Sequence, residues 1–418
     1  MKSWISRRMS PLLSDMAFRR YWLGQSVSLL GGQISMLALP LTAVMVLHAT
    51  AVGMAFLTAI GSLPSLLFSL HAGAWVDQHG NRRRTMVVAD AGRTLLLASI
   101  PAAFFLRILS IPLLIGLWFL VRTFSVFFRV ASSTLFVSLV PKNRYVEANS
   151  LLHTSRATAF FVGPAIAGFL IQTLTAPVTL LADSLSFLTS AASLALIHPQ
   201  EPAPAQAHRR DLAGGLRFIR RSTVLRYSFA SQATMSLFRT MFMAVSILYA
   251  TRSLGITPTE WGIIFGPSSV GAMAASALAG RFSKRLGLGP TLIWGCALLT
   301  VPYLLVPLAQ GPHVAVVAML FFAEGLASSG SMIHAVSDGT IQAAAIPDEL
   351  RARVSAAFVT VSTGLRPVGA LLAGALAYAA GLHATLWVAA SGGSLAFLWL
   401  LPVRKLGQVE SLAEVGAR

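Results

Sequence analysis

The sequence predicts an all-α membrane protein whose twelve transmembrane helices form two pseudo-symmetric six-helix bundles. Three observations lead to this fold class. Only 11% of the 418 residues are charged and 55% are hydrophobic, whereas soluble domains carry about a quarter charged residues. Apolar runs of about 20 residues, the length that a helix needs to cross the hydrocarbon core of a bilayer, recur along the chain. Segments of the first half also reappear in the second half in the same order.

Each apolar run is expected to be a helix, because backbone polar groups in lipid must be satisfied within their own segment. The first run is too long to be the core of a signal peptide. In chain order the runs span 21–47, 52–76, 85–106, 110–132, 149–172, 176–198, 226–250, 260–280, 289–309, 313–337, 354–380 and 383–402.

The positions of lysine and arginine predict how these helices are oriented. Basic residues gather in the cytoplasmic loops of membrane proteins. The loops on one side hold only Arg107 and Arg252, whereas the N-terminal segment, the loop at 82–84, the middle loop and the C-terminal tail on the other side are rich in arginine. Both termini are therefore expected in the cytoplasm. The same distribution explains the net charge of +18 without a nucleic-acid partner.

The longest internal loop divides the chain into two halves. Residues 198–215 contain three prolines and are polar and alanine-rich, which is typical of a linker. Residues 216–227 alternate apolar and basic positions at helical spacing, which predicts a short helix on the inner membrane face. The predicted domains are 1–198, a linker at 199–225, and 226–418.

Two pairs of segments match between the halves. Parallel six-helix repeats around a site at the membrane midplane are a transporter architecture. Chance similarity between helices rich in small residues is the alternative. The matched pairs are Gly73 with Gly280, Asp77 with Lys284, Gly80 with Gly287, Gly163 with Gly369, and Gly168 with Gly374.

The stretch GAWVDQHGNRRR, at 73–84, predicts a conformational latch formed by Gly73, Asp77, Gly80, Arg82 and Arg83. Gly73 permits close approach of another helix, and Gly80 permits a sharp chain reversal. The Asp77 carboxylate can accept hydrogen bonds from a helix N-terminus or from the two arginines. The alternative is an ordinary turn whose positive charges only orient the helices.

The fifth run contains FFVGPAIAGFL at 160–170. Pro164 removes a backbone donor and can kink the helix, while Gly163 and Gly168 leave a flat face for a neighbouring helix. By themselves these features predict a tightly packed, kinked helix, and they require no part in coupling.

Four ionisable residues fall near the middle of their runs: Arg122, Arg239, Glu324 and Arg366. Such residues are costly in lipid and usually face a cavity or a partner. Glu324 is the acidic residue at midplane, so it is the candidate proton carrier; a fixed Arg–Glu ion pair is the alternative. Three arginines against one glutamate also favour an anionic substrate.

Other ionisable residues lie nearer the ends of their runs. Asp90 and Arg93 are three residues apart, which predicts a local pair on one helical face. Asp183 is expected to hold helices together, and His334 to be a buried, hydrogen-bonded histidine.

Several site classes are excluded by what the sequence lacks. Cys296 is the single cysteine, so there is no intrachain disulfide and no multi-cysteine metal site. None of the four lysines follows a glycine, so there is no GxxxxGK[ST] loop through which ATP would power the chain. We expect no metal, no cofactor and no enzymatic activity.

These residues carry a family resemblance. The chain resembles the major facilitator superfamily along nearly its whole length, and most of all the bacterial drug-efflux branch with macrolide and siderophore exporters. The latch residues match the superfamily's loop signature, while Trp75, Gln78 and Asn81 depart from it. Residues 160–170 resemble the antiporter signature, which in the family accompanies export and coupling. Arg122 in FLVRTFSVF resembles an arginine that the family links to proton coupling.

The resemblance implies a monomeric secondary transporter of the bacterial inner membrane that exports an amphiphilic small molecule by proton antiport. In the family, the first, fourth, seventh and tenth helices line the central site, the two bundles rock to give alternating access, and the latch forms in the outward-facing state. The alternatives are uptake or facilitated diffusion, or a non-transporting membrane sensor or assembly factor on the same scaffold.

Overall fold

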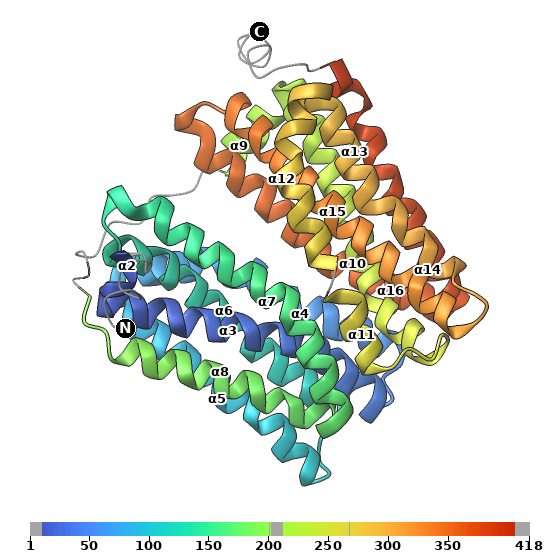
Figure 1. Cartoon of the computed structure of the whole chain (residues 1–418), viewed down its shortest axis with the longest axis horizontal. Helices are drawn as coiled ribbons and strands as arrows, with labels where there is room; N and C mark the ends of the chain where they lie inside the picture. The colour runs from blue at the N-terminus through green and yellow to red at the C-terminus, as the bar shows by residue number, and fades with distance from the viewer. Residues whose placement is uncertain (1–10, 200, 202–211, 267, 406–418) are drawn as a thin grey trace, which may run out of the picture. The chain divides into compact units, whose positions relative to one another are not determined.

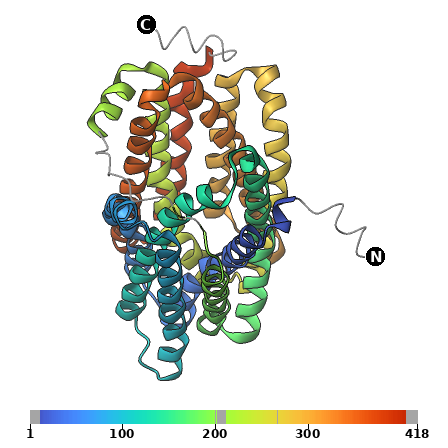
Figure 2. The ribbon, with the colours of Figure 1, turned by 90° about the vertical axis from the view of Figure 1, so that its left-hand side faces the viewer.

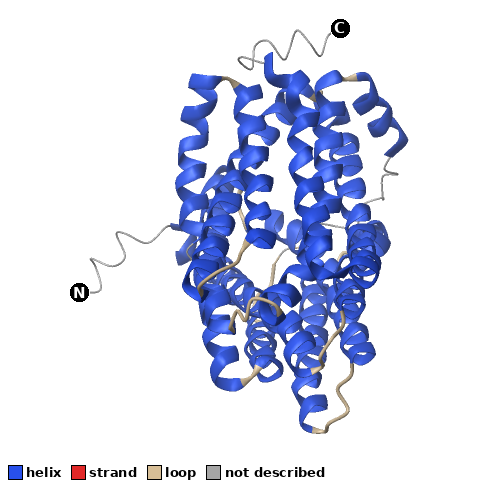
Figure 3. Ribbon diagram, turned by 90° about the vertical axis from the view of Figure 1, so that its right-hand side faces the viewer, coloured by secondary structure: helices blue, strands red, loops and turns tan. Residues whose placement is uncertain are grey.

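The structure is a computed structural model that describes residues 11–199, 201, 212–266 and 268–405. Within these residues the chain is helical and contains no strand (Figure 3). Ten of the described helices are long and apolar enough to cross a membrane. The predicted class, an all-α multi-pass membrane protein, is therefore confirmed.

The helices of the first half follow the first six apolar runs (Figure 1). α3 is extended by a π-helical turn, and a 3-10 turn precedes α7. The elements are α2 (Pro11–Ser14), α3 (Met16–Leu41), η1 (Thr42–Val46), α4 (Ala51–His79), α5 (Arg82–Phe105), α6 (Ile111–Leu139), η2 (Lys142–Arg144), α7 (Tyr145–Leu174) and α8 (Ala176–Ala195).

The helices of the second half are more often interrupted. The elements are α9 (Leu212–Arg221), α10 (Thr223–Arg252), α11 (Pro258–Phe265), α12 (Ser268–Leu286), α13 (Leu288–Thr300), η3 (Val301–Leu304), α14 (Leu305–Leu308), α15 (His313–Ala345), α16 (Asp348–Ser394) and η4 (Leu395–Lys405).

Two places separate the ten spanning helices from the twelve predicted runs. α16 covers the eleventh run and the start of the twelfth, and it is divided at Gly381, whose φ of 85° is non-helical. The eighth run corresponds to α11 and α12, neither of which is among the ten. The count of twelve spans therefore stays a prediction.

Side chains at the helix starts explain several of these boundaries. Asp15 accepts from the backbone N–H of Ala17 at 2.8 Å and so caps α3. Ser222 accepts from Leu225 N–H and begins α10. Because that cap falls at 222, the short helix predicted at 216–227 is α9 instead, ending at Arg221. Satisfying the first N–H groups of a helix in this way stabilises its N-terminus.

The chain divides into two compact units, residues 1–47 with 63–208 and residues 48–62 with 209–418. The first part of α4 therefore belongs to the second unit. The predicted domains, 1–198 and 226–418, place the whole of α4 in the first. In the second unit Ala55 packs against Gly374 of α16, and Ala59 joins a core built largely from small residues of α10, α15 and α16. Small side chains allow helices to approach closely.

Equivalent helix contacts occur inside each unit, as the sequence repeat predicts. In the first unit Gly163 of α7 faces Gln33 of α3, and in the second unit Gly369 of α16 faces the backbone of Leu237 in α10. The contact of α5 with α6 likewise corresponds to that of α13 with α15. The helices of the second unit lie side by side with similar directions (Figure 2).

Candidate functional site

A row of polar residues follows one face of α15. Its members are three or four residues apart, which is the spacing of neighbours on one helical face. They are Glu324, Ser328, Ser331, His334, Asp338 and Gln342. The last four line a cavity of about 420 Å³ within the second unit.

The wall of this cavity combines polar and apolar side chains from several helices. α10 contributes Arg239 and α15 contributes His334 and Asp338, while Met235 and Phe358 provide apolar surface. Small-molecule sites usually combine an apolar lining with a few polar groups that fix the ligand's orientation. The cavity is therefore suited to a molecule that has both polar and apolar parts.

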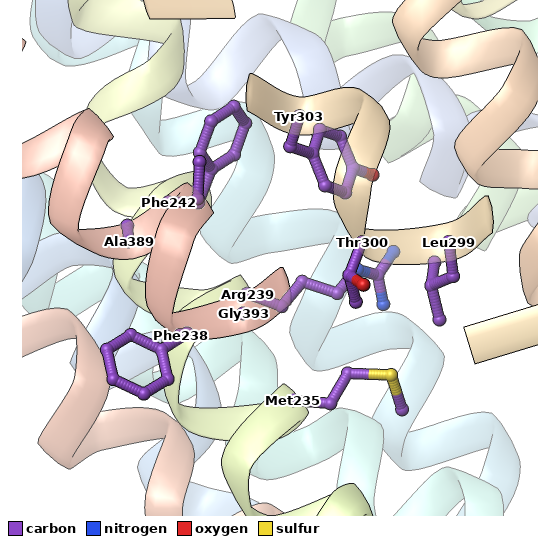
Figure 4. A pocket seen from close by; sticks show the side chains of 10 residues that line it. Met235, Phe238, Arg239, Phe242, Leu299, Thr300, Tyr303, Ala389 and Gly393 are labelled. Atoms are coloured by element: carbon purple, nitrogen blue, oxygen red, sulfur yellow. The ribbon is translucent and has the colours of Figure 1, made fainter. Parts of the chain in front are cut away.

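Arg239 links the cavity to a buried polar group. Its guanidinium extends toward Thr300 in a smaller pocket beside Tyr303 (Figure 4). The Tyr303 hydroxyl interacts with both Arg239 and the Glu324 carboxyl group, and the Ser328 hydroxyl donates to Glu324 at 3.4 Å. Two of the four midplane candidates are thus brought together, with opposite charges and a tyrosine between them.

The other two midplane candidates are not among the residues that line this cavity. Arg122 is in α6 of the first unit, with its guanidinium carbon 5.4 Å from the centroid of the Trp118 ring. Arg366 is an exposed residue of α16 and does not line this cavity. The predicted excess of arginine is therefore absent from the described cavity wall, where Asp338 accompanies Arg239. Preference for an anionic substrate therefore stays a prediction that the wall of this cavity does not test.

Sequence reasoning missed Asp338 and misjudged His334. Asp338 lies one residue beyond the predicted run 313–337, yet α15 continues to Ala345, and the Asp338 carboxylate accepts from the Gln342 amide at 2.7 Å. His334 is buried, but its Nδ1 has no hydrogen-bond partner among the described residues. The unbroken polar spacing from Glu324 to Gln342 would have found both.

The predicted latch is only partly described. Gly80 follows the end of α4 with φ 68°, as a sharp reversal requires, and its repeat partner Gly287 has φ 91° before α13. Asp77 lies in α4, but its side chain is outside the described part of the structure. The latch therefore stays a prediction.

The α5 N-terminus is occupied by a carboxylate that the sequence did not suggest. Glu201 accepts from the backbone N–H groups of Arg82 at 2.5 Å and Arg83 at 2.9 Å. The Arg83 side chain donates to the carbonyl oxygens of Ala195 and Ile197, where α8 ends. Anions are favoured at helix N-termini and cations at C-termini, so these contacts fasten the end of α8 to the start of α5.

Glu201→Ala is expected to lower the free energy of unfolding by about 0.5–2 kcal/mol, the usual cost of removing an N-terminal capping group. Thermal unfolding of the detergent-solubilised chain measures it. Gln78→Ala, at an exposed position in the last turn of α4, is the control. Equal unfolding temperatures for the two variants would contradict the capping role.

The space beside Gly73 is open in this structure. Among the described residues no heavy atom lies within 4 Å of a Cβ placed at Gly73, and the same holds for its repeat partner Gly280. The close helix approach expected at Gly73 therefore stays a prediction. Lys284, the repeat partner of Asp77, is exposed in the last turn of α12.

The small residues of α7 are packed as expected. Gly163, Pro164 and Gly168 are buried, and α7 continues through Pro164 from Tyr145 to Leu174. A Cβ at Gly163 would overlap the Gln33 side chain of α3. The flat glycine face therefore contacts the first long helix, and a coupling role for the segment stays a prediction.

Comparison with known proteins decides the family. A family model described as Major Facilitator Superfamily matches residues 21–365 and 228–416. The chain belongs to the Major Facilitator Superfamily. The resemblance predicted from the sequence is thereby confirmed, and the protein is a membrane transporter rather than an enzyme.

Relatives within the superfamily include efflux pumps. Multidrug efflux pump Tap of Mycolicibacterium fortuitum is 26% identical over 357 residues, covering 81% of this chain and 84% of that protein. Tap of Mycobacterium bovis is 28% identical over 345 residues, covering 77% and 78%. A bacterial homologue of the iron transporter ferroportin, solved in an inward-facing state, has a TM-score of 0.76 at 16% identity, covering 95% of this chain and 100% of that one. This last likeness supports the superfamily fold alone.

Proposed function

We propose that this superfamily member exports an amphiphilic small molecule, such as a drug or a macrolide-like or siderophore-like compound, in exchange for protons. It acts as a monomer in the bacterial inner membrane, with both termini in the cytoplasm, and its two bundles rock to alternate access. The observation that carries the proposal is the second-unit cavity, whose amphiphilic wall includes Arg239, together with the interaction of Tyr303 with both Arg239 and Glu324 behind that wall. Similarity to proteins described as multidrug efflux pumps supports the direction of transport.

Competition at Glu324 provides the coupling. The ionised carboxyl group attracts Arg239 and can accept a hydrogen bond from a substrate donor. When the carboxyl group binds a proton, its attraction for Arg239 and for a positively polarised substrate group weakens. A substrate and a proton then exclude one another at the same group, and this competition is what antiport requires.

A compound panel tests the function. Inverted membrane vesicles expose the cytoplasmic face, so amphiphilic compounds should accumulate inside them when an inward-acidic gradient is imposed. Accumulation should collapse when a protonophore dissipates the gradient. Movement that is insensitive to the protonophore would favour facilitated diffusion, and the absence of any transported compound would favour the sensor alternative.

A further inference from the structure

The first unit encloses a second set of charged side chains, far along the chain from Glu324. Asp90 and Arg93 of α5 meet Asp183 of α8, and their exposed fractions are 0%, 5% and 2%. The sequence predicted only a local pair between the first two residues. The packing of α5 against α8 brings in the third.

Arg93 is held in one place by its neighbours. It forms an ion pair with Asp90, and its guanidinium carbon lies 4.2 Å from the ring centroid of Phe128 and 4.0 Å from that of Phe187. Aromatic faces attract a guanidinium, more strongly when water is excluded. The Arg93 guanidinium is therefore held by its ion pair with Asp90 and by its contacts with these two rings.

The hydrogen bond that the Asp183 side chain accepts comes from a neutral group, a serine hydroxyl. Asp183 accepts from the Ser186 hydroxyl at 3.0 Å, and Ser35 of α3 lies beside it. A Cβ at Gly31 of α3 would overlap both Asp183 and Ser186, so α3 closes tightly over this carboxyl group. Asp183 is within electrostatic reach of Arg93 but forms no ion pair with it at salt-bridge distance among the described residues.

The charges in this cluster do not balance. Two carboxyl groups face one guanidinium, while the side chains of α3 and α6 that contact the cluster, such as Ser35 and Phe128, are neutral. With both carboxyl groups ionised, one negative charge would remain uncompensated away from water, at a cost of several kcal/mol. Binding of one proton removes that charge.

Several buried polar atoms in the described cluster lack a hydrogen-bond partner that a protonated carboxyl group could supply. Among the described residues, Asp90 Oδ2, Ser35 Oγ, Ser190 Oγ and Arg93 Nε are buried without a hydrogen-bond partner of good geometry. Buried polar groups are nearly always satisfied, and each exception calls for an explanation. A protonated carboxyl group supplies a donor that an ionised one lacks.

We infer that Asp90, Arg93 and Asp183 form a second proton-binding site, in which Asp183 exchanges the proton and the Asp90–Arg93 pair positions it. Uptake of one proton converts the Asp183 carboxylate to a carboxylic acid and brings the cluster from one net negative charge to neutrality. Release returns the proton to water and restores the negative charge. Use of this site in antiport rests on the proposed function, but the presence of the proton does not.

Infrared spectroscopy of the full chain in liposomes tests the site without any transport. The background is Glu324→Gln with Asp338→Asn, so that the two carboxyl groups of the polar row on α15 do not contribute. We expect a carbonyl band of a protonated carboxylic acid that disappears as the pH rises. Asp183→Asn should abolish the band, and Asp15→Asn, which changes an exposed aspartate, should leave it unchanged.

Two further variants separate a proton site from a merely structural cluster. Asp90→Asn leaves Asp183 as the only counter-ion of Arg93, so the band should be lost although Asp183 is intact. Arg93→Gln leaves two carboxyl groups and no cation, so the band should grow. A band that is the same in Asp183→Asn and Asp90→Asn as in the background would overturn the inference.

The test also holds if a variant fails to fold. In that case the background chain labelled with ¹³C-aspartate decides, because a titrating band that does not shift with the label is not from aspartate and refutes the site. A failed infrared test leaves export through Glu324 standing. A chain that transports no compound but shows the band retains the proton site and loses the proposed function.

Discussion

Glu324→Gln is expected to abolish uphill, proton-driven transport while leaving downhill exchange of the same compound intact. Glutamine has nearly the same shape as a protonated glutamate, but it exchanges no proton and carries no charge to attract Arg239. A membrane potential of about 100 mV is worth about 2.3 kcal/mol per charge, which sustains a gradient of about 50-fold for a neutral compound exchanged with one proton. The variant should bring that gradient close to unity.

Accumulation and counterflow in the same vesicles measure this effect. Glu349→Gln is the matched control, because it removes an exposed carboxyl group at the start of α16, outside the cavity. The control should accumulate the compound as the unmodified chain does. Uphill accumulation by Glu324→Gln at the full rate would remove Glu324 from the coupling mechanism.

The architecture was predictable because its determinants are local and repeated. The length of an apolar run, the sign of the residues in the next loop and the spacing of Gly80 and Gly287 can all be assessed one segment at a time. The pairing of Gly163 with Gly369 went further, since it anticipated that α7 contacts α3 as α16 contacts α10. Parallel repeats fold into equivalent bundles, so one match specifies two contacts.

The charged clusters were harder to predict because they depend on the register between helices. Asp90 and Arg93 are recognisable as a pair from their spacing, but nothing in the sequence places Asp183 against them. Glu201 shows the same limit, since an isolated carboxylate in a polar linker has no periodic pattern that points to the start of α5. Asp338 differs: its helical spacing from His334 was present, and only the end of the hydropathy run concealed it.

The close approach of α13 and α15 is what places the polar row beside the cavity, and it depends on glycine. A Cβ at Gly330 would overlap the backbone of Leu298 and Leu299, and a Cβ at Gly295 would overlap the backbone of His334. Backbone atoms cannot rotate away as a side chain can, so the two helices would have to separate.

Gly330→Ala should therefore destabilise the fold by about 1–3 kcal/mol, the usual cost of overpacking a core, and it should shift His334 and Asp338 out of the cavity wall. Thermal unfolding in detergent measures the first effect, and loss of compound binding measures the second. Gly325→Ala lies on the same helix with no heavy atom within 4 Å of the added Cβ among the described residues, so it should be neutral or stabilising by about 0.4–1 kcal/mol. Because both changes add one methyl group to α15, their difference isolates the helix contact. If the two variants unfold at the same temperature, the close approach of α13 to α15 is not what holds the cavity wall in place.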